Sequence, residues 1–240
     1  MSSRERAQNR AQYRLKHMNR RAVLEYIRAN RSATKAGLSQ VTGLTFMAIK
    51  KIFAELEELD LIREDVQERG GVGRRATTFT INEQYGYTIG IYINIYRTSV
   101  GLLDLHGTVL AQQDLEMAPA PEDSQGFVDS LAVMAEQVIH QAGVALERIL
   151  GVGVSVPGPI DAERGIVLMP PNLKVLHYLP LQELLEQRLQ QKVFLQKDTN
   201  AVALGEYWHG LGRGYADIAY IDIDMGIGSG LVIGGELYEG

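Results

Sequence analysis

The 240-residue sequence contains no cysteine, which excludes a disulfide framework, a cysteine nucleophile and any zinc site built on thiolates. It also has no apolar run approaching the roughly 18 residues of a membrane span. The first residues lack the apolar core of a signal peptide, so we expect a cytoplasmic protein with no membrane partner. Hydrophobic residues make up 45% of the chain, which is ordinary for a globular protein.

The charge is distributed unevenly along the chain. Residues 1–82 carry 16 Lys and Arg against 9 Asp and Glu, a net charge of +7. Residues 83–240 carry 8 against 20, a net charge of −12. A basic first third suits contact with a polyanion such as nucleic acid, whereas the acidic remainder would be repelled by one. A basic solvated surface with no partner is the alternative interpretation.

The basic third reads as a set of short helices. Val23, Leu24 and Ile27 recur at helical spacing, with Leu15 upstream. A second helix fits residues 34–43, with Thr34 as N-cap, Gly43 as terminator, and Leu38 and Val41 pointing inward. Thr45 can cap a third helix, which has one buried stripe: Ile49, Ile52, Phe53 and Leu56. Two short helices joined by a turn at residues 43–45 match the helix-turn-helix pattern.

The opposite face of the third helix is a candidate DNA-reading surface. Lys50 and Lys51 can reach guanine edges or phosphates, and Thr45 can bond a phosphate. Phe46 and Met47 either touch thymine methyl groups or pack locally. The later exposed positions of this helix are acidic and should lie away from DNA: Glu55, Glu57, Glu58 and Asp60.

A hairpin is predicted after the third helix, from residue 61 to residue 82. Its glycine-rich tip is followed by Arg74 and Arg75, which suit a narrow minor groove. The pattern is that of a winged helix, so we expect residues 1–82 to be a winged helix-turn-helix DNA-binding domain. A solvated hairpin tip in a protein-binding winged helix is the alternative. The basic arm, residues 1–16, is expected to be a mobile tail that either touches phosphate or has no role.

The acidic two-thirds, residues 83–240, reads as an α/β domain. Three strands come first, within residues 87–117, and a helix follows, traced by Phe127, Leu131, Met134 and Val138. Residues 149–156 form an apolar run typical of a buried strand. A helix near residues 181–189, a strand at 193–195 and a helix at 200–208 come next, and strands at 218–223 and 231–233 flank a glycine-rich turn.

Four separated motifs in this body resemble the ROK family of sugar kinases and sugar-responsive repressors. They are GVGVSVPGPID (151–161), PNL (171–173), DTNAVALGEYWHGLG (198–212) and GIGSGLVIGGELYEG (226–240). The repressors of this family place a winged helix-turn-helix before a kinase-like body. The resemblance implies an actin-like, ribonuclease-H-like ATPase fold with two lobes around a cleft.

The phosphate loops depart from the kinase pattern. ROK kinases carry Asp-x-Gly-Gly-Thr where this chain has residues 92–96, so that Tyr92 replaces an acid and Ile95 and Tyr96 fill the phosphate space. The second loop lacks its threonine and has Asp224 where a polyphosphate would lie. Repulsion by that carboxylate would cost on the order of several kcal/mol in a partly desolvated cleft. We therefore expect no ATP turnover, no cofactor and no metal.

The sugar side is partly retained. Asp198 matches the family's catalytic base, and here it would be a remnant sugar-binding acid. Its neighbour, usually asparagine, is Lys197, while Gly158 and Asn172 match loop positions near the sugar. The alternative role for Asp198 is to cap the helix that follows it.

The resemblance also implies segments beyond Gly240, including a Glu-x-Gly-His sugar motif and often a Cys-rich zinc motif. We therefore expect the second lobe to be incomplete, in either a truncated relative or a fragment of a longer product. The leading hypothesis is a ROK transcriptional regulator, expected to be a repressor, that binds a DNA operator as a homodimer or higher oligomer and takes a sugar effector. The alternatives are a ROK sugar kinase with an appended DNA-binding domain, and a DNA-binding fragment with an inert body.

Overall fold

The computed structural model describes residues 3–65, 77–116, 123–224 and 226–239, with side chains described from Tyr13 onward. The chain divides into two compact units, residues 1–85 and 86–240. Each unit has its own buried core and is described separately below.

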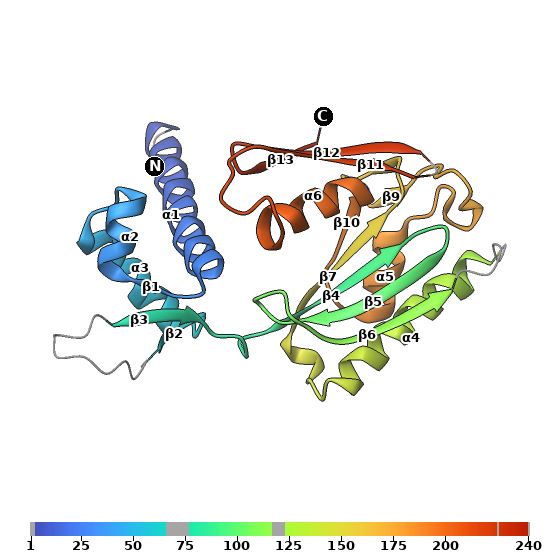
Figure 1. The fold of residues 1–240 in the computed structure, drawn as a ribbon, viewed down its shortest axis with the longest axis horizontal. Helices are drawn as coiled ribbons and strands as arrows, with labels where there is room; N and C mark the ends of the chain where they lie inside the picture. Colours follow the sequence, from blue (N-terminus) through green and yellow to red (C-terminus); the bar gives the residue numbers. More distant parts are fainter. Residues whose placement is uncertain (1–2, 66–76, 117–122, 225, 240) are drawn as a thin grey trace. The chain divides into compact units, whose positions relative to one another are not determined.

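The first unit combines three helices with a small antiparallel sheet (Figure 1). The strand order in that sheet is β1-β3-β2. Its elements are α1 (Ser3–Asn30), β1 (Ala33–Thr34), α2 (Lys35–Thr42), α3 (Phe46–Glu58), β2 (Ile62–Asp65) and β3 (Thr78–Ile81). The expected basic tail is helical from Ser3, and the short strand β1 was not predicted.

Local side-chain chemistry sets the ends of α2 and α3. The Thr34 hydroxyl accepts a hydrogen bond from the backbone N–H of Gly37 at 3.0 Å, and Thr45 does the same for Ala48 at 3.2 Å. Gly43 adopts a left-handed conformation with φ of 68°, which glycine allows without strain. The predicted caps and the predicted terminator are therefore confirmed.

The core of the first unit forms between α1, the stripe of α3 and the sheet. All four stripe residues of α3 are buried, as predicted. Phe53 meets Phe79 of β3 edge to face, with ring centroids 4.7 Å apart. Val41 was wrongly predicted to point inward, because its side chain is 62% exposed and Leu38 alone fills the core from α2. Leu15 of α1 is also exposed rather than buried.

The second unit is built on a five-stranded sheet with strand order β10-β7-β4-β5-β6. β7 runs parallel to both β4 and β10, whereas β4, β5 and β6 form an antiparallel meander. The elements up to the last strand of this sheet are β4 (Tyr87–Ile93), β5 (Arg97–Leu103), β6 (Val109–Glu116), α4 (Ser124–Gln141), η1 (Leu146–Arg148), β7 (Ile149–Val156), β8 (Ile160–Asp161), β9 (Ile166–Val167), η2 (Lys174–Leu176), α5 (Leu181–Leu189) and β10 (Val193–Lys197).

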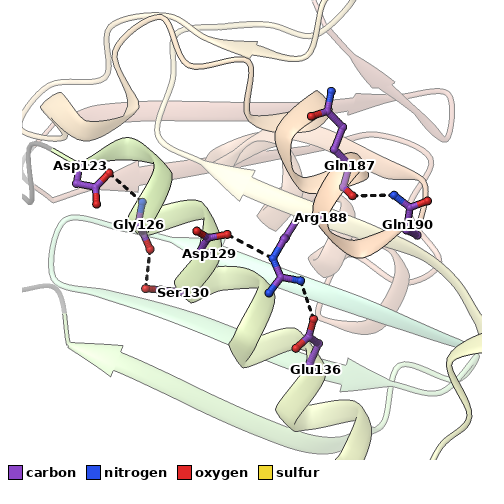
Figure 2. Close-up of polar contacts among 8 residues, drawn as sticks. All are labelled: Asp123, Gly126, Asp129, Ser130, Glu136, Gln187, Arg188 and Gln190. Carbon is purple, nitrogen blue, oxygen red and sulfur yellow. Dashed lines mark hydrogen bonds and ion pairs between the residues drawn. The ribbon is translucent and has the colours of Figure 1, made fainter.

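Helices α4 and α5 pack together with one face of this sheet into a continuous apolar core. Arg188 of α5 links the two helices, because its guanidinium contacts the carboxylates of Asp129 and Glu136 on α4 at 3.3 and 3.0 Å (Figure 2). Asp123 caps α4 by accepting a hydrogen bond from the backbone N–H of Gly126 at 3.0 Å. These contacts hold α4 and α5 together against the sheet that contains β7 and β10.

A second, three-stranded antiparallel sheet packs on helix α6 (Asp198–His209). Its strands are β11 (Ile218–Ile223), β12 (Ile227–Ile233) and β13 (Glu236–Tyr238). Most of the predicted glycine-rich turn is strand β12, and β13 was not predicted. The other face of this sheet is apolar and exposed, with side chains of Ile221, Ile223 and Ile227 that are 64%, 76% and 83% exposed.

Two glycines of β12 allow this close approach to α6. A Cβ atom on Gly230 would lie 2.2 Å from the backbone oxygen of Thr199, and one on Gly228 would lie 2.8 Å from the Thr199 methyl group. The Thr199 hydroxyl donates a hydrogen bond to the Ser229 carbonyl oxygen at 2.9 Å. By contrast, a Cβ on Gly226 would meet no atom within 4 Å.

We predict that Gly230→Ala destabilises the second unit by about 1–3 kcal/mol, because backbone atoms of α6 and β12 would have to move apart. Gly226→Ala, from the same segment, should change the free energy of unfolding by less than about 0.5 kcal/mol. Urea unfolding of the two variants measures both values. Equal effects of the two substitutions would show that close packing is not what requires glycine in β12.

Candidate functional site

The outer face of α3 presents the residues predicted to contact DNA. The side chains of Phe46 and Met47 are 51% and 70% exposed, and Lys50 and Lys51 are exposed as well. Neither lysine forms an ion pair with any other described residue. Thr45 uses a lone pair of its hydroxyl to cap the helix, which leaves the hydroxyl hydrogen available to donate to a phosphate oxygen.

Glu55 differs from its predicted position. It was expected to be a solvated acid pointing away from DNA, but its side chain is only 19% exposed and faces α1. Its carboxylate pairs with Lys16 at 2.9 Å and with the guanidinium of Arg20. Hydrogen bonds from Lys16 and then Arg20 lower the pKa of Glu55. Lys16 and Arg20 of α1 neutralise the Glu55 carboxylate. The carboxylate therefore does not cancel the positive charge of Lys51, which lies one helical turn earlier on α3.

The other predicted DNA contacts, Arg74 and Arg75, lie outside the described residues. Strands β2 and β3 pair antiparallel on either side of that segment, with Asp65 opposite Thr78. The hairpin strands predicted there are therefore present.

A cavity of about 450 Å³ lies in the second unit, where β4, β7, β10 and β11 end. All four residues predicted to bind sugar line it: Gly158, Asn172, Lys197 and Asp198. Residues of the two altered phosphate loops line the same cavity: Asn94, Ile95, Asp224 and Gly226. Segments far apart in the sequence thus meet in one place, as the resemblance implied.

Lys197 and Asp198 stand where β10 passes into α6. The Lys197 ammonium donates a hydrogen bond to the Ser229 carbonyl oxygen at 3.1 Å. Gly158 leaves room for this side chain, since a Cβ there would lie 3.1 Å from the Lys197 stem. Asp198 is the first residue of α6, and its carboxylate accepts a hydrogen bond from the Thr199 backbone N–H at 2.7 Å. The alternative prediction that Asp198 is the N-cap of α6 is therefore wrong, because Lys197 occupies that position, while Asp198 lines the cavity.

The electrostatics of the cavity are dominated by carboxylates. Burial raises the pKa of the half-buried Asp198, and the nearby charge of Asp222 raises it further, against the lowering effects of the Thr199 N–H and Lys197. The pKa of Tyr220 is also raised, by desolvation first and then by the charge of Asp222. Proton uptake by Asp198 is therefore easier than for a carboxylate in water.

Sequence reasoning missed Asp222 as a cavity residue. The signal was present in the alternation Ile-Asp-Ile-Asp at residues 221–224, which places Asp222 and Asp224 on the same face of a strand. Asp222 lies opposite Gly228 in the ladder, and the Asp224 N–H donates to the Gly226 carbonyl oxygen at 3.0 Å. Asp222 thus lies opposite a residue without a side chain.

The segment that corresponds to the first phosphate loop confirms only part of the prediction, because Ile95 lines the cavity whereas Tyr96 is 57% exposed and is not among the lining residues. The Asn94 amide donates to the Tyr92 hydroxyl at 2.9 Å, and its oxygen accepts the Tyr96 N–H at 3.2 Å. Ile95 of the same loop contributes to the cavity wall.

In the described ranges, no group of three or more acidic, histidine or cysteine side chains is arranged to hold a metal ion. No described helix has the length and apolarity needed to cross a membrane.

Comparison with known proteins agrees with this architecture. The sequence profile of the ROK family matches residues 88–240. The chain is 30% identical over 227 residues to the xylose repressor of Bacillus spizizenii, covering 94% of this chain and 58% of that protein. It is 28% identical over 224 residues to the DNA-binding transcriptional repressor Mlc of Escherichia coli, covering 93% of this chain and 55% of that protein.

Two solved structures show the same likeness. A ROK family transcriptional regulator, a homologue of E. coli Mlc, is 26% identical with a TM-score of 0.67, covering 87% of this chain and 52% of that one. A ROK family glucokinase from Streptomyces griseus, in complex with glucose and AMPPNP, is 32% identical with a TM-score of 0.57, covering 65% and 47%. The chain therefore belongs to the ROK family. It spans about half the length of the curated relatives that it matches.

We predict that Asp198→Asn stabilises the second unit near neutral pH. The folded pKa of this carboxyl lies above its unfolded value, so the wild-type free energy of unfolding falls as pH rises through the folded pKa. Asparagine keeps an oxygen for the Thr199 N–H but carries no charge to desolvate. The gain should be larger at pH 8 than at pH 4.5.

Urea unfolding at the two pH values measures this gain, with Glu163→Gln, an exposed position, as the control expected to show none. If the Asp198→Asn variant were less stable than the wild type at pH 8, the hydrogen bond to Thr199 would outweigh the cost of burying the charge.

Proposed function

We propose that this ROK protein is a transcriptional repressor whose first unit binds operator DNA as a winged helix-turn-helix. Its second unit senses a sugar and does not phosphorylate one. The curated relatives named above are repressors, which supports the regulatory role. The observation that carries the proposal is the outer face of α3, which lies opposite the buried stripe and exposes five side chains: Thr45, Phe46, Met47, Lys50 and Lys51.

The architecture of the first unit favours DNA binding over a general basic surface. Helices α2 and α3 are joined by a three-residue turn, and the N-terminal half of such a second helix fits the major groove. Lys50 and Lys51 lie in that half and are unpaired within the described residues, while the acids lie at the other end or, as Glu55, are neutralised by α1. Arg74 and Arg75 would then serve the wing.

The acidic second unit helps to define which surface faces DNA. Residues 86–240 carry 8 Lys and Arg against 19 Asp and Glu, and this net charge of −11 repels a polyanion, so phosphate contacts fall on the basic residues of the first unit. Binding as a homodimer would place two α3 helices on a palindromic site, as in other helix-turn-helix proteins. A soluble regulator of this kind would act in the cytoplasm.

Loss of kinase activity is supported by the cavity. Asp224 replaces a neutral residue at the expected polyphosphate position and lines the cavity, and the Asn94 side chain, which also lines it, is held by the Tyr92 hydroxyl and the Tyr96 backbone N–H. The alternative function, a sugar kinase with an appended DNA-binding unit, draws on Asp198, which lies in the cavity like the family's base. Sugar-dependent ATP hydrolysis would favour that alternative.

Sensing requires that a sugar favour one arrangement of the protein over another. The cavity retains Gly158, Asn172, Lys197 and Asp198 and connects them to α6 and β12 through Thr199. A sugar bound there would bias the position of α6, and this movement is the proposed route by which a ligand weakens operator binding.

We predict that Lys50→Ala or Lys51→Ala weakens operator binding by about 1–3 kcal/mol if the lysine reads a base. The operator is first selected by the wild-type protein from random-sequence duplexes, and affinities are then measured for the selected and a scrambled duplex. A base contact lowers affinity for the selected duplex alone. A phosphate contact lowers both and reduces the salt slope by about one.

The matched control is Lys192→Ala, an exposed lysine of the acidic unit, which should leave both affinities unchanged. Full affinity in a variant lacking both Lys50 and Lys51 would refute the assignment of α3 as the reading helix.

A further inference from the structure

We propose that Asp222 and Asp224 exclude phosphorylated sugars from the cavity, so that only neutral sugars can bind there. This inference rests on the proposed sensing function and specifies its ligand. The cavity is about 450 Å³, which suits a monosaccharide. Nothing in the family profile or in the names of the relatives assigns a role to Asp222.

The charges that line the cavity point to this selectivity. Among the described residues, three carboxylates line it, those of Asp198, Asp222 and Asp224, against the single ammonium of Lys197. That ammonium is held by the Ser229 carbonyl oxygen at 3.1 Å rather than directed freely into the space. No arginine of the described ranges lines the cavity, and arginine is the side chain best suited to phosphate. A sugar phosphate would therefore enter a negative field.

No positive charge on a described residue neutralises this field. Asp222 lies opposite Gly228 in the ladder, and its side-chain hydrogen bond is with the phenol of Tyr220. Neither Asp222 nor Asp224 forms an ion pair with another described residue. The raised pKa values of Asp198 and Tyr220 are in keeping with this field, since the charge of Asp222 contributes to both. In ordinary phosphate-binding loops, backbone N–H groups and a hydroxyl occupy this place instead.

The remaining lining residues suit an uncharged polyol. The amides of Asn94 and Asn172 and the carboxylates can bond hydroxyl groups, which both donate and accept. Pro157 and Pro159 supply apolar wall for the C–H faces of a sugar ring. The site therefore combines hydroxyl partners with apolar surface, and its described residues offer no untethered cation for phosphate.

The test compares neutral sugars with their phosphate esters. D-Glucose and D-xylose are titrated into the full chain by calorimetry up to about 50 mM, alongside glucose 6-phosphate and xylose 5-phosphate. The wild type should bind at least one neutral sugar and bind its phosphate ester at least tenfold more weakly. The double variant Asp222→Asn with Asp224→Asn should bind that ester at least tenfold better than the wild type does, with neutral-sugar affinity changed less than threefold.

The matched control is Glu147→Gln with Glu163→Gln, which removes the same charge from exposed positions of the same unit. It should not improve binding of the ester. Thermal unfolding confirms that each variant is folded.

Three results would overturn the inference: equal wild-type affinity for sugar and ester, no gain of ester binding in the Asp222 and Asp224 variant, or no neutral sugar bound at about 50 mM. Operator binding by the same preparations separates this failure from that of the proposed function. If a sugar phosphate bound to the protein and caused it to release the operator, the proposed sensing function would stand. Only the inference that Asp222 and Asp224 exclude phosphorylated sugars would then fail. If the wild type bound no selected duplex, the repressor assignment itself would fail.

Discussion

The contact on which the second unit depends is the seating of Thr199 against strand β12. The Thr199 hydroxyl and the Lys197 ammonium share the Ser229 carbonyl oxygen, and Gly228 and Gly230 let the backbones approach this closely. The contact fixes the start of α6, and with it the positions of Lys197 and Asp198 at the cavity. Two glycines that resemble a phosphate loop in the sequence are therefore required by helix packing, whatever the cavity binds.

The two units differ in the charge of their candidate binding surfaces. In the first unit, α1 neutralises Glu55, so the exposed half of α3 stays basic. In the second unit, Asp222 and Asp224 make the cavity wall negative, with one tethered ammonium beside them. This division favours a protein that holds DNA with one unit and an uncharged ligand with the other.

Much of this could be predicted from the sequence wherever the determinants are local. The caps at Thr34 and Thr45 and the stripe of α3 follow from residue type and spacing, and the resemblance to known motifs indicated the four sugar-side residues. Val41 was predicted to be buried and is exposed, whereas Glu55 was predicted to be exposed and is partly covered by α1. Residue type and spacing within one helix do not show which of its positions a neighbouring helix covers. Asp222 was missed because its role depends on which face of β11 meets the cavity. Residues 227–230 of β12 were taken for part of a turn because their glycines serve a tertiary contact, whereas residues 231–233 were predicted as strand.

The central claim is that the cleft of this kinase-like unit has lost the ability to hold a nucleotide. Calorimetric titration of the full chain with ATP and Mg²⁺, with and without a neutral sugar present, tests it most directly. The account predicts no saturable heat up to millimolar nucleotide in either titration. Saturable binding that is lost when Gly226 is replaced by a bulky residue would place the nucleotide beside that loop and contradict the account.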